Sequence, residues 1–239
     1  MAEVVKLMDV WKIYYVGKVE FPALRGVDLS INKGEMIAIM GPSGSGKTTL
    51  LNMMGLLDRP TRGKIYIEGI DVMKLSSDKV AEIRNRKIGF VFQHFNLINR
   101  LSVYENIELP LVARGLPRKI REKMVINALE MVGGEISWLR KKPNQLSGGQ
   151  QQRVAIARAI VGEPEILLAD EPTGNLDRKS ARIVVETFTK LNEGGLTIAI
   201  VTHDPEIANC TNTIYVIRDG KIVNTAIPDI DKCILKTSV

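Results

Sequence analysis

Short stretches of consecutive apolar residues alternate with helix-like segments through most of the chain. Four of these stretches have the length of buried strands: Met36–Met40, Ile88–Phe92, Ile166–Ala169 and Thr197–Val201. Helical patterns occur between them, from Thr48 to about Leu57, from a Ser76-Ser77-Asp78 cap to about Arg86, and near Lys179–Asn192. Because strands that alternate with helices build parallel sheets, this pattern predicts an α/β fold with helices flanking the sheet.

Three regions depart from the alternation. The first part, to about Glu35, has short apolar runs between glycine and Asn-Lys-Gly turns, and with Lys64–Gly69 it predicts additional strands. Residues 95–162 are mostly helical in pattern, which predicts a helical lobe inserted within one domain spanning residues 1–239. Near the C-terminus, Asp219-Gly220 lies between Ile214–Ile217 and Lys221–Val223 and predicts a β-hairpin.

The composition is that of a soluble globular protein, with 45% hydrophobic and 25% charged residues in a chain of 239. No stretch approaches the ~18 apolar residues of a membrane span, and Met1–Val5 lacks the basic and apolar blocks of a signal peptide. We therefore expect a cytoplasmic protein, unless a partner holds it at a membrane. Cys210 and Cys233 form no metal-ligand pattern, and we expect two reduced thiols.

The formal net charge of +6 does not select a partner. It fits attraction to an anionic membrane surface, to a nucleotide or to nucleic acid. A lysine-rich, solvated surface explains the same value equally well, so the chemistry has to come from motifs.

A glycine-rich segment between a predicted strand and a predicted helix matches the phosphate-binding pattern G-x-x-x-x-G-K-[ST]. Its residues are Gly41, Pro42, Ser43, Gly44, Ser45, Gly46, Lys47 and Thr48. Glycines let backbone N–H groups turn inward around a β-phosphate, and the helix that follows directs its positive N-terminus at the same anion. Lys47 adds a charge near the β- and γ-phosphates, and Thr48 offers a hydroxyl to Mg²⁺. The segment predicts a bound nucleoside triphosphate but does not separate kinases, GTPases and motors.

Two carboxylates end the apolar strand Ile166–Ala169. Asp170 continues the strand and can lie beside the phosphate-binding loop, where it would hold Mg²⁺ or its water. Glu171 comes next with its side chain directed differently, so it can face the γ-phosphate and polarise the attacking water.

A second anion site is predicted at Leu146-Ser147-Gly148-Gly149-Gln150. This pentapeptide begins a helical pattern that runs through Val154, Ala157 and Ile160 and ends near Gly162-Glu163-Pro164. A serine hydroxyl and open backbone N–H groups at a helix start bind anions. One chain therefore carries two phosphate-binding helix starts.

The glycine-rich loop, the pentapeptide and Asp170-Glu171, in this order, resemble the ABC ATPases over nearly the whole chain. The resemblance implies a P-loop NTPase core of the RecA-like type, with an N-terminal antiparallel β subdomain and an inserted helical subdomain that carries the pentapeptide. It also implies ATP and Mg²⁺ as cofactors and an ATPase activity coupled to transport across a membrane.

The same resemblance assigns roles to further residues. Gln93 matches the Q-loop, Gly174-Asn175-Leu176-Asp177 the D-loop and His203 the switch histidine, while Tyr14 is similar to the aromatic that stacks on adenine, with Tyr15 as its alternative. The implied catalytic residues are Lys47, Gln93, Glu171 and His203, the implied Mg²⁺ ligands are Thr48, Gln93 and Asp170, and Thr49 joins the nucleotide-binding set. His94 stands where relatives often carry a second glutamine, and we expect no functional cost.

A head-to-tail dimer is implied as well. Each ATP would lie between Gly41–Thr48 of one copy and Ser147–Gln150 of the other, with Asp177 reaching across the interface. Glu171 and His203 would meet the γ-phosphate. Such a dimer explains why one chain has two anion sites.

Four segments look like the MacB/LolD branch of macrolide and peptide exporters and lipoprotein-release ATPases. They are Gly55–Gly63, Phe92–Leu97, Glu105–Leu111 and Asp170–Asp177. The implied partners are separate membrane permease subunits, which would place the chain peripherally at the cytoplasmic face of the cell membrane, and no nucleic acid is expected.

Three other classes of ABC protein share these motifs. Polar amino-acid importers have similar ATPases and are the nearest alternative. DNA-repair ATPases split the two anion motifs with a long coiled coil, and no sustained heptads separate Lys47 from Ser147. Translation ABC proteins carry two cassettes in tandem, and this chain has one.

Overall fold

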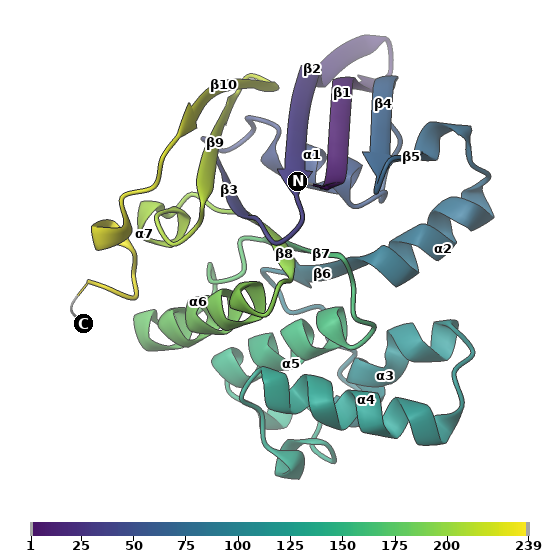
Figure 1. Ribbon diagram of the computed structural model, residues 1–239, viewed down its shortest axis with the longest axis vertical. Coiled ribbons are helices and arrows are strands. Elements are labelled where there is room, and N and C mark those ends of the chain that lie inside the picture. Colours follow the sequence, from purple (N-terminus) through teal and green to yellow (C-terminus); the bar gives the residue numbers. More distant parts are fainter. Residues whose placement is uncertain (1, 238–239) are drawn as a thin grey trace.

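The computed structural model describes residues 2–237 and contains two sheets (Figure 1). The antiparallel sheet has the order β2-β1-β4-β5, built from β1 (Glu3–Val16), β2 (Val19–Asn32), β4 (Arg62–Ile67) and β5 (Ile70–Asp71). The larger sheet has the order β10-β9-β3-β8-β7-β6, built from β3 (Met36–Met40), β6 (Ile88–Phe92), β7 (Ile166–Asp170), β8 (Thr197–Val201), β9 (Thr213–Arg218) and β10 (Lys221–Ala226). All neighbouring strands of the larger sheet are parallel except the β9–β10 hairpin.

Seven α-helices complete the described part of the chain. They are α1 (Lys47–Met54), α2 (Ser77–Lys87), α3 (Val103–Ala113), α4 (Arg118–Met131), α5 (Gly148–Ile160), α6 (Arg178–Glu193) and α7 (Pro205–Ala208). Short 3₁₀ turns span Val72–Lys74, Ile136–Trp138, Pro143–Gln145 and Ile230–Lys232. The fold is the expected α/β arrangement with an antiparallel β portion and a helical portion. How far the helical lobe extends beyond its helices stays a prediction.

Both faces of the larger sheet are covered, as strand β7 illustrates. Ile166 and Leu168 pack into a core shared with α1 and the antiparallel sheet, whereas Leu167 and Ala169 pack into a core shared with α3, α4, α5 and α6. Successive side chains of a strand point to opposite faces, so a strand buried on both sides is apolar throughout. Figure 1 shows the antiparallel sheet above the larger sheet and the helices α3–α6 below it.

Several helices begin where the sequence supplies a side-chain cap. Ser76 accepts a hydrogen bond from the Lys79 N–H at 3.4 Å and caps α2, as its position before the helical pattern predicted. Ser102 and Glu105 form a reciprocal capping box at α3. Asp177 caps α6 by accepting from the Ser180 N–H at 2.9 Å.

Two elements differ in length from their predictions. Helix α1 ends at Met54 and not near Leu57, because Leu56 has a left-handed φ of 55° that a right-handed helix cannot contain. The predicted hairpin is present, and both its strands extend further than the apolar runs indicated. Asp219 and Gly220 both have positive φ, as a two-residue hairpin turn requires.

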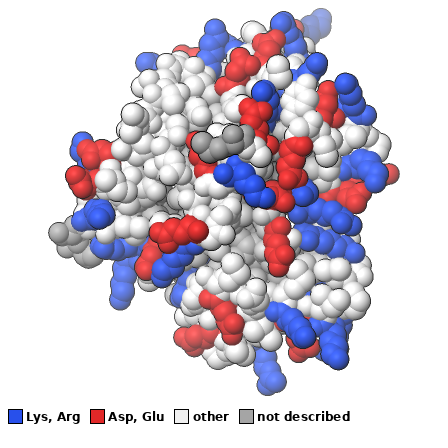
Figure 2. All heavy atoms as spheres, in the orientation of Figure 1, with Lys and Arg blue, Asp and Glu red and all other residues white. Residues whose placement is uncertain are grey.

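The surface fits a solvated exterior of mixed sign. On the face in Figure 2, basic and acidic side chains are interspersed. Opposite charges on the surface also form ion pairs: Lys87, for example, contacts Glu68 at 3.0 Å and Glu165 at 3.2 Å. No α-helix among residues 2–237 has both the length and the apolar character to cross a bilayer.

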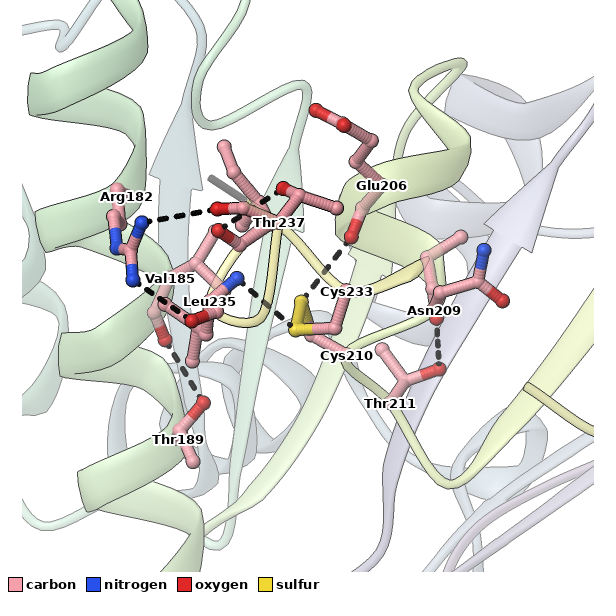
Figure 3. The surroundings of a disulfide bond; sticks show 12 residues. Arg182, Val185, Thr189, Glu206, Asn209, Cys210, Thr211, Cys233, Leu235 and Thr237 are labelled. Atoms are coloured by element: carbon pink, nitrogen blue, oxygen red, sulfur yellow. Dashed lines mark hydrogen bonds between the residues drawn. A yellow bond between two sulfur atoms is a disulfide. The ribbon is translucent and has the colours of Figure 1, made fainter. Parts of the chain in front are cut away.

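The expectation of two reduced thiols was wrong. Cys210, which follows α7, forms a disulfide with Cys233 in the C-terminal segment (Figure 3). Nothing in a spacing of 23 residues indicates pairing, because it is the fold that returns the chain to α7. Arg182 of α6 donates to the carbonyl oxygens of Leu235 at 2.8 Å and Thr237 at 3.2 Å. The C-terminal segment is therefore tied to both α6 and α7.

Removing the disulfide should destabilise the fold. Cys233→Ser should lower the free energy of unfolding by about 3 kcal/mol, because the closed loop restricts the unfolded chain. Denaturant unfolding with and without a dithiol reductant measures the change. The reductant should weaken the wild-type protein by a similar amount and leave the variant as it is. An unfolding midpoint of the wild-type protein that ignores the reductant would contradict the bond.

Candidate functional site

The register of the larger sheet places four motif-bearing segments side by side. Asp170 pairs with Val201 of β8 on one side and with Phe92 of β6 on the other, while Val201 also pairs with Ile39 of β3. These strands are parallel, so their carboxyl ends share one edge of the sheet. The segments that begin at this edge contain Gly41–Thr48, Glu171, Gln93 and His203. Their proximity follows from the pairing.

The loop between β3 and α1 has the shape of an anion cradle. Gly44 and Gly46 have φ values of 77° and 106°, which side chains rarely adopt. A Cβ at Gly41 would overlap the carbonyl oxygen of Ile217, so only glycine fits there. The cap position of α1, Gly46, supplies no side-chain hydrogen bond, which leaves the first N–H groups of the helix for an anion.

Two polar side chains, Lys47 and Ser45, lie inside this cradle. The Lys47 ammonium donates to the carbonyl oxygens of Gly41 at 2.7 Å and Pro42 at 3.0 Å, so it spans the loop. The Ser45 hydroxyl is buried and has no partner among the described residues. A buried hydroxyl without a partner and a lysine ammonium inside the loop are consistent with a ligand rich in oxygen atoms.

Asp170 and Thr48 form the candidate magnesium site. Burial raises the pKa of Asp170, with a smaller contribution from the charge of Glu171, while a hydrogen bond with Thr48 and the charge of Lys47 act to lower it. A divalent cation would offset this unfavourable burial. One carboxylate and one hydroxyl suit Mg²⁺, which keeps several ligand positions for water and phosphate. No cluster of three or more acidic, histidine or cysteine ligands occurs among the described residues.

Glu171 turns away from the direction of β7, as expected. Its φ of 45° lies in the left-handed region, which is unfavourable for a glutamate. Its backbone N–H is held by the carbonyl oxygen of Val201 at 2.9 Å. The carboxylate lies 2.9 Å from Nδ1 of His203. The His203 tautomer that carries its proton on Nδ1 can donate a hydrogen bond to this carboxylate. The pair is oriented beside the cradle.

Gln93 faces the loop that follows Glu171. Its side-chain amide donates to Asn175 at 3.3 Å, and Asn175 in turn contacts the Gln93 carbonyl oxygen and His94 Nδ1, each at 3.0 Å. In this conformation Gln93 and His94 together hold Asn175. His94, which stands where relatives often carry a second glutamine, therefore has a contact of its own that no sequence pattern indicates.

The pentapeptide starts α5 as predicted, within a capping box. The Ser147 hydroxyl accepts from the Gln150 N–H at 3.3 Å, and the Gln150 side chain accepts from the Ser147 N–H at 2.9 Å. A Cβ at Gly149 would lie 2.8 Å from the Ser180 hydroxyl in the first turn of α6. One at Gly148 would meet Leu176 and Phe95. These approaches bring the pentapeptide to the Asp177-capped helix and not to the loop 41–48.

Tyr14 and Tyr15 lie on opposite faces of β1. The Tyr14 phenol donates to a carboxylate oxygen of Asp58 at 3.1 Å, and the Thr49 hydroxyl of α1 is within hydrogen-bonding reach. Tyr15, at 62% exposure, is more open than Tyr14 at 38%. Since strand residues alternate in direction, only Tyr14 is beside the helix that begins at the cradle.

Two residues of α5 that carried no prediction tie the pentapeptide helix to the site. Gln152 is fully buried and donates to the carbonyl oxygens of Pro172 at 2.5 Å and Phe92 at 3.4 Å. Arg158 donates to the carbonyl oxygens of Asn96 at 2.5 Å and Phe95 at 3.0 Å. Burial lowers the pKa of this arginine. A helical pattern alone does not distinguish such residues from ordinary polar positions.

A family profile described as ABC transporter matches residues 24–174, more than half of the chain. The lipoprotein-releasing system ATP-binding protein LolD of Aquifex aeolicus is 44% identical, over 93% of this chain and 97% of that protein. The macrolide export ATP-binding/permease protein MacB of Syntrophobacter fumaroxidans is 49% identical over 92% of this chain, which spans only 31% of MacB.

One solved structure has the same fold over nearly all of the chain. It is the dimeric ATP-binding cassette MJ0796 of Methanocaldococcus jannaschii in a post-hydrolysis state, bound to ADP and Pi. The TM-score is 0.87 at 45% identity, and the match covers 94% of this chain and 99% of that one.

Replacing the carboxylate of Glu171 should separate binding from chemistry. Glu171→Gln removes the group that would take a proton from water, so ATP turnover should fall by roughly 100-fold or more while ATP affinity is retained. Steady-state hydrolysis and nucleotide titration provide the two measurements. Glu130→Gln, an exposed position on α4, is the matched control. Wild-type turnover in Glu171→Gln would remove Glu171 from the role of general base.

Proposed function

Because the chain belongs to the ABC transporter family and is one of its ATP-binding, ATP-hydrolysing subunits, we propose that it acts as a head-to-tail homodimer. Two copies close around two ATP molecules, and hydrolysis powers transport through separate membrane subunits. Each ATP lies between the loop 41–48 of one copy and Ser147–Gln150 of the other.

The observation that carries the dimer is the orientation of the second helix start. Ser147 is exposed, and the close approaches of Gly148 and Gly149 are to Phe95, Leu176 and Ser180. None of these residues belongs to the cradle of the same chain. A phosphate-binding helix start that does not meet its own cradle is explained if it serves a second copy. Asp177, which caps the adjoining helix α6, then lies at the same interface.

Each residue of the cradle has a part in this scheme. Lys47 exchanges its contacts with Gly41 and Pro42 for the β- and γ-phosphates. Thr48 and Asp170 hold Mg²⁺, which neutralises phosphate charge when bound. Glu171 accepts the proton of the attacking water, and His203 orients that carboxylate and approaches the γ-phosphate. Gln93 would exchange its contact with Asn175 for Mg²⁺, as a further ligand beside Thr48 and Asp170.

The transport system is proposed to be an exporter or a lipoprotein-release system. This assignment is supported by the similarity to MacB and LolD, whose names describe macrolide export and lipoprotein release. The alternative of a polar amino-acid importer is not favoured by these relatives. The similarity to LolD, which is named as the ATP-binding protein of a lipoprotein-releasing system, supports our proposal that separate permease subunits supply the membrane path. The chain would then sit peripherally on the cytoplasmic face.

A groove of about 930 Å³ between the sheet and the helical layer is the proposed docking surface for those subunits. Its wall includes Phe92, directly before Gln93, and Arg158, which holds Phe95 and Asn96. Arg84, Arg86 and Arg114 also line it, against a single acidic residue, Glu82. A short helix with apolar and acidic side chains from a membrane subunit fits this lining. A movement of that helix would displace Phe92 and, with it, the adjoining Gln93.

An arginine at Ser147 should disable the dimer and spare the monomer. Ser147→Arg places a bulky cation where the partner's γ-phosphate enters, so dimerisation and hydrolysis should be lost. Nucleotide titration of the monomer should give wild-type affinity, because the cradle at 41–48 is unchanged. Gel filtration with Mg-ATP in the Glu171→Gln background reports the dimer.

Ser137→Arg adds the same side chain at another exposed position and should leave both properties intact. Loss of ATP binding by the Ser147→Arg monomer would mean that the pentapeptide acts within its own chain. That result would refute the head-to-tail arrangement.

A charge in the groove should uncouple the subunit from its permease. Ala113, an exposed residue at the end of α3, lines the groove, whereas its exposed neighbour Val112 does not. Ala113→Asp should weaken co-purification with the membrane subunits by roughly 10-fold or more and leave hydrolysis by the isolated subunit at its wild-type rate. Val112→Asp is the control. Equal losses in both variants would place the contact elsewhere.

A further inference from the structure

We propose that Asp58 and Lys12 are positioning residues that fix the ring of Tyr14 for stacking on the adenine of ATP. This inference rests on the proposed function, ATP binding, and on the adenine-stacking role that the family resemblance implies for Tyr14. It goes further by assigning a role to two residues outside the nucleotide motifs. It also explains how the adenine-binding ring of Tyr14 is held at a constant position relative to the phosphate-binding loop 41–48.

The Asp58 carboxylate is the centre of the arrangement. One oxygen accepts from the Tyr14 phenol at 3.1 Å. The other accepts from the Lys12 ammonium and from the Arg59 N–H, both at 2.7 Å. Lys12 also donates to the Arg59 carbonyl oxygen at 2.9 Å. The carboxylate is thus fixed from two sides before it receives the phenol, and the direction of the phenol is fixed in consequence.

Lys12, Asp58 and Tyr14 together form a clamp, and the position of Asp58 connects this clamp to the phosphate cradle. Asp58 lies four residues beyond the end of α1 (Lys47–Met54), whose N-terminus is the anion site. The connection is tight, since the Leu57 N–H bonds to the Asn52 carbonyl oxygen at 2.9 Å and Gly55 packs against Phe90. One rigid unit, α1 with the residues that follow it, therefore holds both the phosphates and the carboxylate that orients the ring.

Lys12 determines which face of the ring is available. Its ammonium lies over the ring of Tyr14 at 4.9 Å from the centroid, as a cation–π contact. A base then has the opposite face for stacking. A cation on one face draws electron density from the ring, which favours an electron-rich purine on the other. The Lys12 side chain is 13% exposed, so its charge is only partly screened by water.

The charge state of the clamp agrees with these contacts. Burial acts to raise the pKa of Asp58, but the hydrogen bonds from Lys12, Arg59 and Tyr14 outweigh it and hold that pKa below its usual value. Burial and the Asp58 hydrogen bond raise the pKa of Tyr14. At neutral pH the carboxylate is ionised and the phenol protonated, which is the combination that the hydrogen bond requires.

The test compares ligands with and without a base. Asp58→Asn keeps the size of the side chain but weakens its hold on Lys12 and Tyr14. Its affinity for ATP should fall roughly 3-fold to 10-fold in a calorimetric titration without Mg²⁺, where no hydrolysis intervenes. Its affinity for inorganic triphosphate, which has no base, should stay at the wild-type value. In steady-state hydrolysis the loss should appear in KM and not in kcat.

Matched variants isolate the effect. Lys12→Met should lose ATP affinity and Lys12→Arg should retain most of it, because an arginine keeps the charge over the ring. Asp231→Asn in the C-terminal 3₁₀ turn and Lys64→Met on β4 change exposed charges away from the clamp and serve as controls. Tyr14→Phe combined with Asp58→Asn should show less than the sum of the two single losses, since both variants break the same hydrogen bond.

The possible outcomes separate this proposal from the one on which it rests. Tyr14→Ala should lower ATP affinity about 10-fold to 100-fold; if it does not, the adenine role of Tyr14 itself is wrong. If Tyr14→Ala weakens ATP binding and Asp58→Asn does not, the adenine role stands and the clamp is refuted. If Asp58→Asn weakens inorganic triphosphate as much as ATP, Asp58 merely supports α1, and the positioning role is refuted.

Discussion

The in-register pairing of β3, β8, β7 and β6 is the constraint on which the rest of the site depends. It brings the ends of four strands to one edge, so that residues far apart in sequence meet around one cradle. The pairing is held by two cores, because the side chains of each strand alternate between them. A one-residue slip of β7 would exchange its two faces and also redirect Asp170 and Glu171. Packing and catalytic geometry are thus set by the same register.

The helical layer is joined to that edge through α5. Gln152 donates to the carbonyl oxygen of Phe92, at the end of β6, and to that of Pro172, directly after Glu171. Arg158 holds the segment that follows Gln93. Both residues contact backbone oxygens. They therefore hold these segments in place whatever side chains the segments carry. Phe95 and Asn96 have left-handed φ values, which these hydrogen bonds help to maintain. A displacement in the groove would therefore move Gln93 and α5 together.

The sequence predicted the parts of the structure that have local signals. Apolar runs, cap residues and the Asp219-Gly220 turn located most elements, and the glycine-rich loop, Asp170-Glu171 and the pentapeptide identified the site. The disulfide was missed because its formation depends on where the C-terminal segment returns to α7. Lys12 and Asp58 were missed for a similar reason, since their relation to Tyr14 exists only after β1 and the end of α1 come together. Ordinary charged residues give no local sign of such contacts.

The backbone at Glu171 shows what the site requires of its sequence. A left-handed φ at a glutamate costs on the order of 1 kcal/mol, and glycine or asparagine would adopt it more readily. The surrounding structure maintains it, since the Glu171 N–H bonds to Val201 and its carbonyl oxygen accepts from the Gly174 N–H at 3.1 Å. The same turn separates the Glu171 side chain from that of Asp170 and directs it to His203. A residue chosen for local stability would lack the carboxylate, so the strain is explained by the chemistry at this position.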